Sequence, residues 1–102
     1  MLLIVVLVVS LLEIQTLTGS PPIVLWHGMG DDCCSPLSLG SIMKLIEKEM
    51  TPAPYIHSLR IGANEAEDKA NGFFMNVNNQ IDYACQLLNS DKNLTKGYHA
   101  IG

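Results

Sequence analysis

The chain has 102 residues, of which 48% are hydrophobic and 16% are charged, and its formal net charge is −4. This composition excludes an intrinsically disordered protein, because such chains are poor in apolar residues and rich in charge. The six Lys and Arg residues stand singly, which argues against a nucleic-acid-binding protein. Three cysteines without a C-x-x-C pair indicate neither a disulfide-rich scaffold nor a zinc site. We therefore expect no metal, and nothing in the sequence predicts a cofactor.

The amino terminus carries an apolar run of the secretory type. Residues 2–12 are apolar except for Ser10, and a polar stretch follows Glu13. A membrane span takes about 20 apolar residues and a secretory signal peptide about 7–15, so the run fits the latter. We expect residues 1–19 to be a signal peptide and the chain to have no stable membrane span; a buried strand or helix is the alternative. In the secretory pathway Asn93, in Asn93-Leu94-Thr95, would be a usable N-glycosylation site.

The first half of the remaining chain predicts two strands joined by a helix. Residues 23–26 are a continuous apolar run, as in a strand covered on both faces. Ser35 and Pro36 predict a helix start, as N-cap and first helical residue, and apolar residues at three- and four-residue spacing continue that helix to about Met50. Residues 55–61 predict the second strand, which Gly62 ends.

The second half predicts another helix and strand. Residues 65–69 are interpreted as a solvated helical turn, and a longer helix follows, capped by Asn71 or Asn76, with a buried face formed by Val77, Ile81, Ala84, Cys85 and Leu88. Residues 89–96 read as a surface loop and residues 98–101 as a third strand. This strand–helix alternation predicts an α/β fold with a parallel sheet and crossover helices. Its open sheet edges and small burial suggest that residues 20–102 are the amino-terminal portion of a larger domain.

The loop after the first strand is the leading candidate site. Ligands of α/β sheets bind at the carboxyl ends of strands, where His27-Gly28-Met29-Gly30-Asp31 follows the apolar run. An H-G-x-G sequence at this place matches the loop from which α/β-hydrolases donate a backbone N–H to a developing oxyanion. An ordinary glycine-rich turn is the alternative.

The other reactive side chains predict no complete catalytic set. No serine lies in a G-x-S-x-G elbow, and none of the histidines, His27, His57 and His99, has an obvious carboxylate partner in sequence. The carboxylates at 31–32 and 65–68 are interpreted as loop-tip and solvated-helix residues. Cys33 and Cys34 are adjacent, which leaves free thiols, a vicinal disulfide or pairing elsewhere open. Cys85 is left odd, so we expect its partner outside the chain or in another molecule.

Several motifs together resemble the palmitoyl-protein thioesterases, in particular their lysosomal type 1 members. The resemblance rests on IVLWHGMGD at 23–31, the two cysteines at 33–34, PLS at 36–38, NGFFMNVN at 71–78 and GYHAIG at 97–102. It extends over essentially all of residues 20–102.

The resemblance implies an α/β-hydrolase that removes thioester-linked fatty acyl groups, chiefly palmitate, from cysteines of S-palmitoylated proteins in the lysosome. It implies that the Met29 backbone N–H is an oxyanion donor supported by His27, Gly28 and Gly30, that Cys33 and Cys34 form a vicinal disulfide, and that Cys85 has a later partner. Gly102 matches the first glycine of the nucleophile elbow. We therefore expect the Ser-His-Asp triad to lie beyond it, and the 102-residue chain to be inactive by itself.

Two other functions remain open from the sequence. The chain could be a catalytically dead secreted binding module, or part of a different lipase-like hydrolase that shares only the H-G-M-G loop. A preference for oxygen esters would distinguish the latter from a thioesterase.

Overall fold

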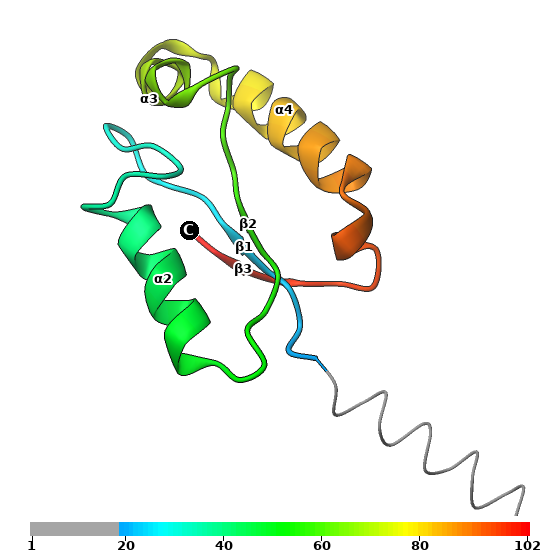
Figure 1. Cartoon of the computed structure of the whole chain (residues 1–102). Coiled ribbons are helices and arrows are strands. Elements are labelled where there is room, and N and C mark those ends of the chain that lie inside the picture. The colour runs from blue at the N-terminus through cyan, green and yellow to red at the C-terminus, as the bar shows by residue number, and fades with distance from the viewer. Residues whose placement is uncertain (1–18) are drawn as a thin grey trace, which may run out of the picture.

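The computed structural model describes residues 19–102, and the expected signal peptide, residues 1–19, lies outside this range except for Gly19. One parallel sheet contains three strands in the order β2-β1-β3 (Figure 1), with bounds β1 Ile23–Leu25, β2 Ile56–Ser58 and β3 His99–Ile101. Ile23 of the central strand is in register with Ile56 on one side and His99 on the other. The predicted α/β fold with a parallel sheet is therefore confirmed.

Helices make the crossovers between the strands. The first crossover contains α2 (Leu39–Glu49), and the second contains α3 (Glu65–Phe74), α4 (Val77–Ser90) and the 3-10 turn η1 (Lys92–Leu94). Figure 1 shows α2 on one side of the sheet and α4 on the other. Within residues 19–102, no helix has both the length and the apolar character that crossing a bilayer requires.

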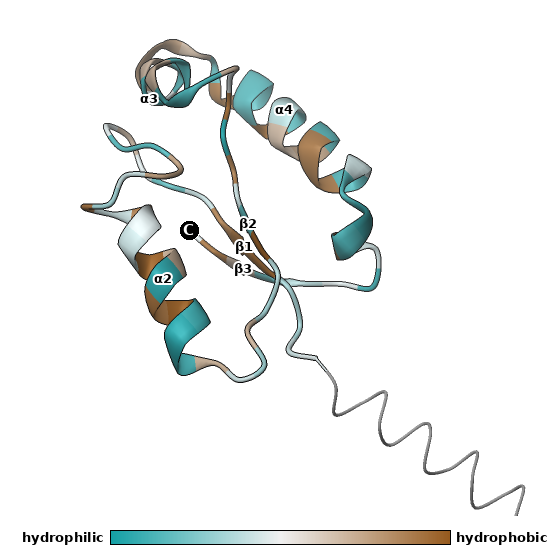
Figure 2. Cartoon of the chain, in the orientation of Figure 1, coloured by the Kyte–Doolittle hydropathy of each residue, from teal (hydrophilic) through white to brown (hydrophobic). Residues whose placement is uncertain are grey.

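The core lies mainly on the α4 side of the sheet. Its buried members are Val24, Leu59, Ile61, Ala84 and Leu94. On the opposite side α2 buries none of its residues, although Figure 2 shows apolar residues along it, and all three residues of β3 are exposed. The central strand is nevertheless buried on both faces, because Ile23 and Leu25 alternate with Val24 and all three are buried.

The first helix begins later than the sequence predicts. Ser35 and Pro36 are not its N-cap and first residue, because the N-cap is Ser38 and α2 starts at Leu39. The Asp32 carboxylate accepts the N–H of Ser35 and so holds this segment in a separate turn. A Cβ on Gly40 would lie only 2.6 Å from the Ser35 carbonyl oxygen, so the turn and the helix fit together only with glycine there.

The predicted second half also needs correction. Residues 65–69 belong to a ten-residue helix, α3, and part of the predicted loop at 89–96 forms η1 and buries Leu94. Asn76 caps α4, as one of the two alternatives predicted, by accepting the Asn78 N–H. The predicted buried face is wrong, because only Ala84 is buried and Val77 is 67% exposed. A 14-residue helix rises about 21 Å and extends past the short strands beneath it.

The second strand is shorter than predicted. It covers only Ile56–Ser58 of the predicted range 55–61, because its partner β1 has three residues. The Leu59 N–H still donates to the Leu25 carbonyl at 2.8 Å, after which the chain leaves the sheet. Leu59 and Ile61 remain buried and direct this segment toward α3.

Candidate active site

The loop after β1 is a tight turn at the carboxyl end of the sheet. The Asp31 N–H donates to the Gly28 carbonyl at 3.2 Å, and Gly30, the third residue of this turn, has φ of +89°. That backbone conformation favours glycine. Met29 is 74% exposed at the turn, and no acceptor among residues 19–102 receives its N–H. The turn therefore contains a backbone donor that no group within residues 19–102 accepts.

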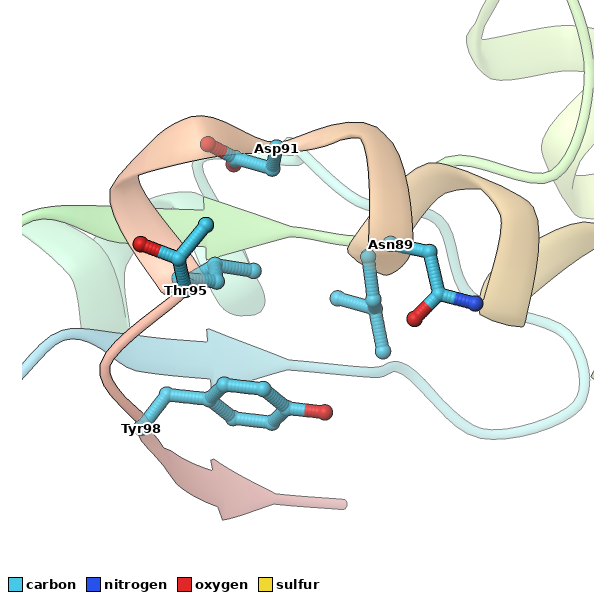
Figure 3. A pocket seen from close by; sticks show the side chains of 6 residues that line it. Asn89, Asp91, Thr95 and Tyr98 are labelled. Atoms are coloured by element: carbon cyan, nitrogen blue, oxygen red, sulfur yellow. The ribbon is translucent and has the colours of Figure 1, made fainter.

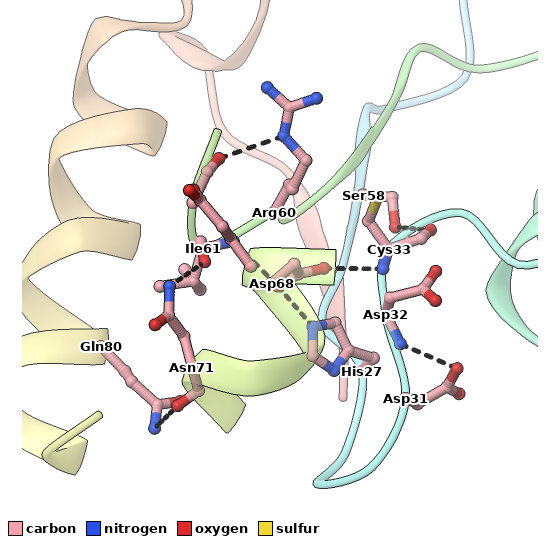
Figure 4. Close-up of polar contacts among 12 residues, drawn as sticks. His27, Asp31, Asp32, Cys33, Ser58, Arg60, Ile61, Asp68, Asn71 and Gln80 are labelled. Atoms are coloured by element: carbon pink, nitrogen blue, oxygen red, sulfur yellow. Dashed lines mark hydrogen bonds and ion pairs between the residues drawn. The ribbon is translucent and has the colours of Figure 1, made fainter. Parts of the chain in front are cut away.

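Asp68 anchors this loop from α3, and its position corrects the sequence interpretation. It was expected on a solvated helical turn but is fully buried. Its carboxylate accepts three N–H donors: the Cys33 backbone at 2.8 Å, the Ile61 backbone at 2.9 Å and His27 Nε2 at 2.7 Å (Figure 4). One carboxylate thus ties together the loop after β1 and the segment after β2.

The start of α3 explains why Asp68 points inward. Asn64 caps the helix by accepting the Glu67 N–H at 2.8 Å, and the Glu67 carboxylate accepts the Ala63 N–H at 2.7 Å. These two contacts resemble a capping box, except that Glu67 accepts the N–H of the residue before the N-cap, and they fix the start of the helix. The Glu67 side chain therefore lies at the start of the helix, and Asp68, the next residue, faces the sheet.

His27 has a carboxylate partner that sequence reasoning missed. Its Nδ1 lies 2.8 Å from the Gly28 carbonyl oxygen and its Nε2 lies 2.7 Å from Asp68 Oδ1, with only 3% of the side chain exposed. Burial of the ring lowers the pKa of His27, but hydrogen bonds to Gly28 and Asp68 and the nearby negative charges outweigh burial and raise the pKa above its ordinary 6.5. The ring links the turn directly to α3.

The two aspartates that follow the turn act as local caps. Asp31 Oδ1 accepts the Ser38 hydroxyl at 2.7 Å and the Asp32 N–H at 2.8 Å. The hydrogen bond from Ser38, followed by that from Asp32, lowers the pKa of Asp31 below its ordinary 3.8. Asp32 accepts the Cys34 and Ser35 N–H groups, so neither carboxylate is left without donors.

The cysteines behind the loop form a vicinal disulfide. Of the alternatives that the sequence left open, the structure contains the bond between Cys33 and Cys34. Cys33 is buried, and its carbonyl accepts the Ser58 hydroxyl at 2.6 Å, which attaches the segment to the end of β2. Glu65 lies close to the two sulfurs, but disulfide sulfurs are not thiolate ligands and offer no metal site. Cys85 is exposed and forms no disulfide within the described range.

A second polar cluster lies at the amino end of the sheet, and sequence reasoning missed it. Asp91 Oδ2 accepts the Tyr55 hydroxyl at 2.6 Å and His57 Nδ1 at 2.8 Å. The Tyr55 hydrogen bond is the largest cause that lowers the pKa of Asp91, from 3.8 to about 2. Beside it is a surface pocket of about 300 Å³ (Figure 3), lined by Leu88, Asn89, Asp91, Leu94, Thr95 and Tyr98.

The structure thus gathers some of the candidate residues and separates others. His27, Gly28, Met29 and Gly30 lie together, with the Cys33–Cys34 disulfide following them. Cys85 on α4 and Asn93 on η1 lie elsewhere, and His99 is exposed on β3. Within residues 19–102 no serine hydroxyl is hydrogen-bonded to a histidine. The site offers a fixed N–H donor that can stabilise negative charge on an oxygen atom.

A parallel sheet with crossover helices and an H-G-x-G loop after a buried strand are typical of the α/β-hydrolase class. The family model "Palmitoyl protein thioesterase" matches residues 22–102, and the chain belongs to this family. This confirms the resemblance found in the sequence.

Two curated proteins show how far the similarity extends. The chain is 43% identical over 101 residues to palmitoyl-protein thioesterase 1 of Caenorhabditis elegans, which covers 99% of this chain and 34% of that protein. It is 33% identical over 81 residues to the palmitoyl-protein thioesterase-dolichyl pyrophosphate phosphatase fusion 1 of Schizosaccharomyces pombe, covering 79% of this chain and 12% of that protein. The chain therefore spans about a third or less of the length of these relatives.

Proposed function

We propose that the protein containing this chain hydrolyses the thioester bond between a long-chain fatty acid and the cysteine of a lipid-modified protein. S-palmitoylated proteins and other fatty acyl thioesters are the proposed substrates. The observation that carries the proposal is the turn at 28–31, which lies within the family match and presents the Met29 N–H at the carboxyl end of the sheet. Membership of a thioesterase family favours a thioester over an oxygen ester as the substrate.

The Met29 N–H is the proposed oxyanion donor. When a nucleophile attacks a thioester carbonyl, negative charge develops on the carbonyl oxygen before the thiolate leaves. A preorganised N–H that already points at this oxygen stabilises the charge without reorganisation. The proposal assigns the nucleophile, the general base and the acid of a Ser-His-Asp triad to no residue of this chain.

We further propose that the protein passes through the secretory pathway to the lysosome and carries a glycan on Asn93. The apolar run at residues 2–12 supports entry into this pathway. Asn93 and Thr95 are exposed on and beside η1, so the sequon is accessible. Asn93→Gln should reduce the mass shift that a glycosidase produces by one glycan, whereas Asn89→Gln, an exposed asparagine outside the sequon, should leave the shift unchanged. An unchanged shift in Asn93→Gln would contradict this assignment.

The test of the oxyanion role uses two substitutions at one position. Met29→Pro removes the N–H itself, and the negative φ of Met29 is compatible with proline. Met29→Ala keeps the N–H and removes only an exposed side chain. In the whole protein, Met29→Pro should lower kcat for a palmitoyl thioester by about 10²–10³, the usual effect of losing one oxyanion donor, while Met29→Ala stays near wild type.

The same assay separates the alternatives. Equal activity of Met29→Pro and Met29→Ala would contradict the oxyanion role. Faster hydrolysis of the matched oxygen ester would favour a lipase-like hydrolase. Absence of hydrolysis of both esters by the wild-type whole protein would favour a binding module.

A further inference from the structure

The two ring nitrogens of His27 both face hydrogen-bond acceptors. Nδ1 is 2.8 Å from the Gly28 carbonyl oxygen, and Nε2 is 2.7 Å from Asp68 Oδ1. A neutral imidazole carries only one N–H and could satisfy only one of these contacts. The Asp68 carboxylate oxygens also accept the backbone N–H groups of Cys33 and Ile61, so they act as acceptors in every contact they make. Both His27 contacts are therefore satisfied together only by a doubly protonated imidazolium.

The Gly28 carbonyl belongs to the same peptide unit as the Met29 N–H. This peptide bond is not among the cis bonds of the chain, so its C=O and N–H lie in one plane and point in opposite directions. Any contact that fixes the carbonyl also fixes the direction of the N–H. A charged donor on the carbonyl oxygen also polarises the peptide unit and makes its N–H a stronger donor.

We infer that His27 is a positioning residue. The buried Asp68 carboxylate holds it as an imidazolium, which donates a hydrogen bond to the Gly28 carbonyl. This hydrogen bond orients and polarises the Met29 N–H for the oxyanion. We call this contact set, Asp68–His27–Gly28, the His27 clasp. The inference rests on the proposed function for its catalytic consequence, whereas the protonation state of His27 does not depend on the function.

The surrounding charges agree with the clasp. The carboxylates that face His27 are Asp68 from α3 and Asp31 from its own loop, and Lys69 interacts with Asp31. Burial lowers the pKa of His27, but the Gly28 and Asp68 contacts raise it more, so the net pKa lies above 6.5. Because the folded-state pKa is raised, the clasp is complete well below pH 6.5 and is lost as the pH rises through the raised folded-state pKa of His27.

The first experiment is an NMR titration of the histidine rings in the full chain. His27 should titrate above 6.5 with both ring nitrogens protonated below its midpoint. Asp68→Asn should lower this midpoint, whereas Asp82→Asn, which makes the same chemical change at an exposed site on α4, should not. A His27 that is a neutral single tautomer below pH 6.5 would overturn the inference. The wild-type titration decides this even if Asp68→Asn does not fold.

The second experiment measures palmitoyl-thioester hydrolysis by the whole protein as a function of pH. In His27→Gln the side chain still carries an amide donor but no charge and no second ring nitrogen. At pH 5 kcat should fall about tenfold with KM little changed, less than the about 10²–10³ expected for loss of the donor itself. The wild-type decline of kcat through the His27 midpoint should disappear in the variant. An unchanged kcat and pH profile would overturn the positioning role.

The two experiments distinguish failure of the inference from failure of the proposed function. Wild-type activity with equal Met29→Pro and Met29→Ala rates contradicts the oxyanion proposal, whatever the state of His27. A full effect of Met29→Pro together with a neutral His27 contradicts only the clasp.

Discussion

Two histidine–aspartate pairs lie at opposite ends of the same small sheet, and they differ mainly in burial. His27 Nε2 and Asp68 Oδ1 are 2.7 Å apart at the carboxyl end, with side chains 3% and 0% exposed. His57 Nδ1 and Asp91 Oδ2 are 2.8 Å apart at the amino end, with side chains 20% and 11% exposed. Nearly equal distances therefore occur in two different solvent environments.

The difference shows what burial adds to a hydrogen-bonded pair. Water can replace a lost partner at Asp91, but it has no access to Asp68, so each donor to Asp68 must be met within the protein. Asp68 also accepts N–H groups from two segments that are far apart in sequence, at Cys33 and Ile61. The buried pair thus fixes backbone geometry, whereas the exposed pair joins surface segments.

Removal of each carboxylate in turn should give the largest difference in stability between the two pairs. Asp68→Ala leaves the Cys33 and Ile61 N–H groups and the His27 ring without their acceptor, and should reduce the free energy of unfolding by about 3–5 kcal/mol. Asp91→Ala should cost clearly less, because solvent reaches its donors. Denaturant unfolding of both variants measures the difference, and equal losses would show that burial does not separate the two ends.

The fold was predictable because its signals are local. The apolar run at 23–26, the helical spacing before Met50 and the strand–helix alternation each depend on neighbouring residues, and the parallel sheet follows from their order. The H-G-M-G loop was placed correctly for the same reason: it directly follows the first apolar run.

The anchoring of that loop was not predictable from local pattern. Asp68 is chemically similar to its neighbours Glu65 and Glu67, and only the position of α3 against the β1 loop decides which of them is buried. The helix start at Leu39 likewise depends on how Asp32 organises the preceding turn, rather than on the Ser35-Pro36 pair. The burial of Asp68 thus depends on contacts with a distant segment, whereas the late helix start depends on a side-chain contact three residues long that competes with the Ser35-Pro36 signal.

Two glycines with positive φ lie at the two ends of the sheet, one in crowded and one in open surroundings. Gly62 and Gly97 both have positive φ, +139° and +105°. A Cβ on Gly62 would lie 2.8 Å from the Glu67 Cβ, whereas a Cβ on Gly97 would meet nothing within 4 Å. Gly97→Ala should therefore lose about 1–3 kcal/mol through backbone strain alone.

Gly62→Ala should lose more than Gly97→Ala, because Glu67 must also move and its contact with the Ala63 N–H is disturbed. Thermal unfolding of the two variants, with the wild type as reference, ranks the losses. A larger loss for Gly97→Ala would mean that crowding beside α3 does not restrain the segment after β2.

The smallest expected effect is a pKa shift at the exposed pair. The Tyr55 hydroxyl is the main cause that holds the pKa of Asp91 at about 2, so Tyr55→Phe should raise this pKa toward 3.8. A depressed folded-state pKa contributes stability above pH 3.8 that is lost as the pH falls toward about 2, and the variant should begin to lose it at a higher pH. NMR titration of the Asp91 carboxyl carbon measures the shift, with Tyr98→Phe as the control in the neighbouring pocket wall.

An unmoved Asp91 midpoint in Tyr55→Phe would assign the low pKa to other donors, such as the Asn93 N–H.

The contributions of Asp91 and His27 to stability depend on pH in opposite directions. The pKa of His27 is raised, so its contribution is present in acid and lost as the pH rises. Acid should therefore weaken the contacts of Asp91 first, whereas the turn that holds the Met29 N–H should keep its His27 contact until the pH rises through the raised pKa of His27.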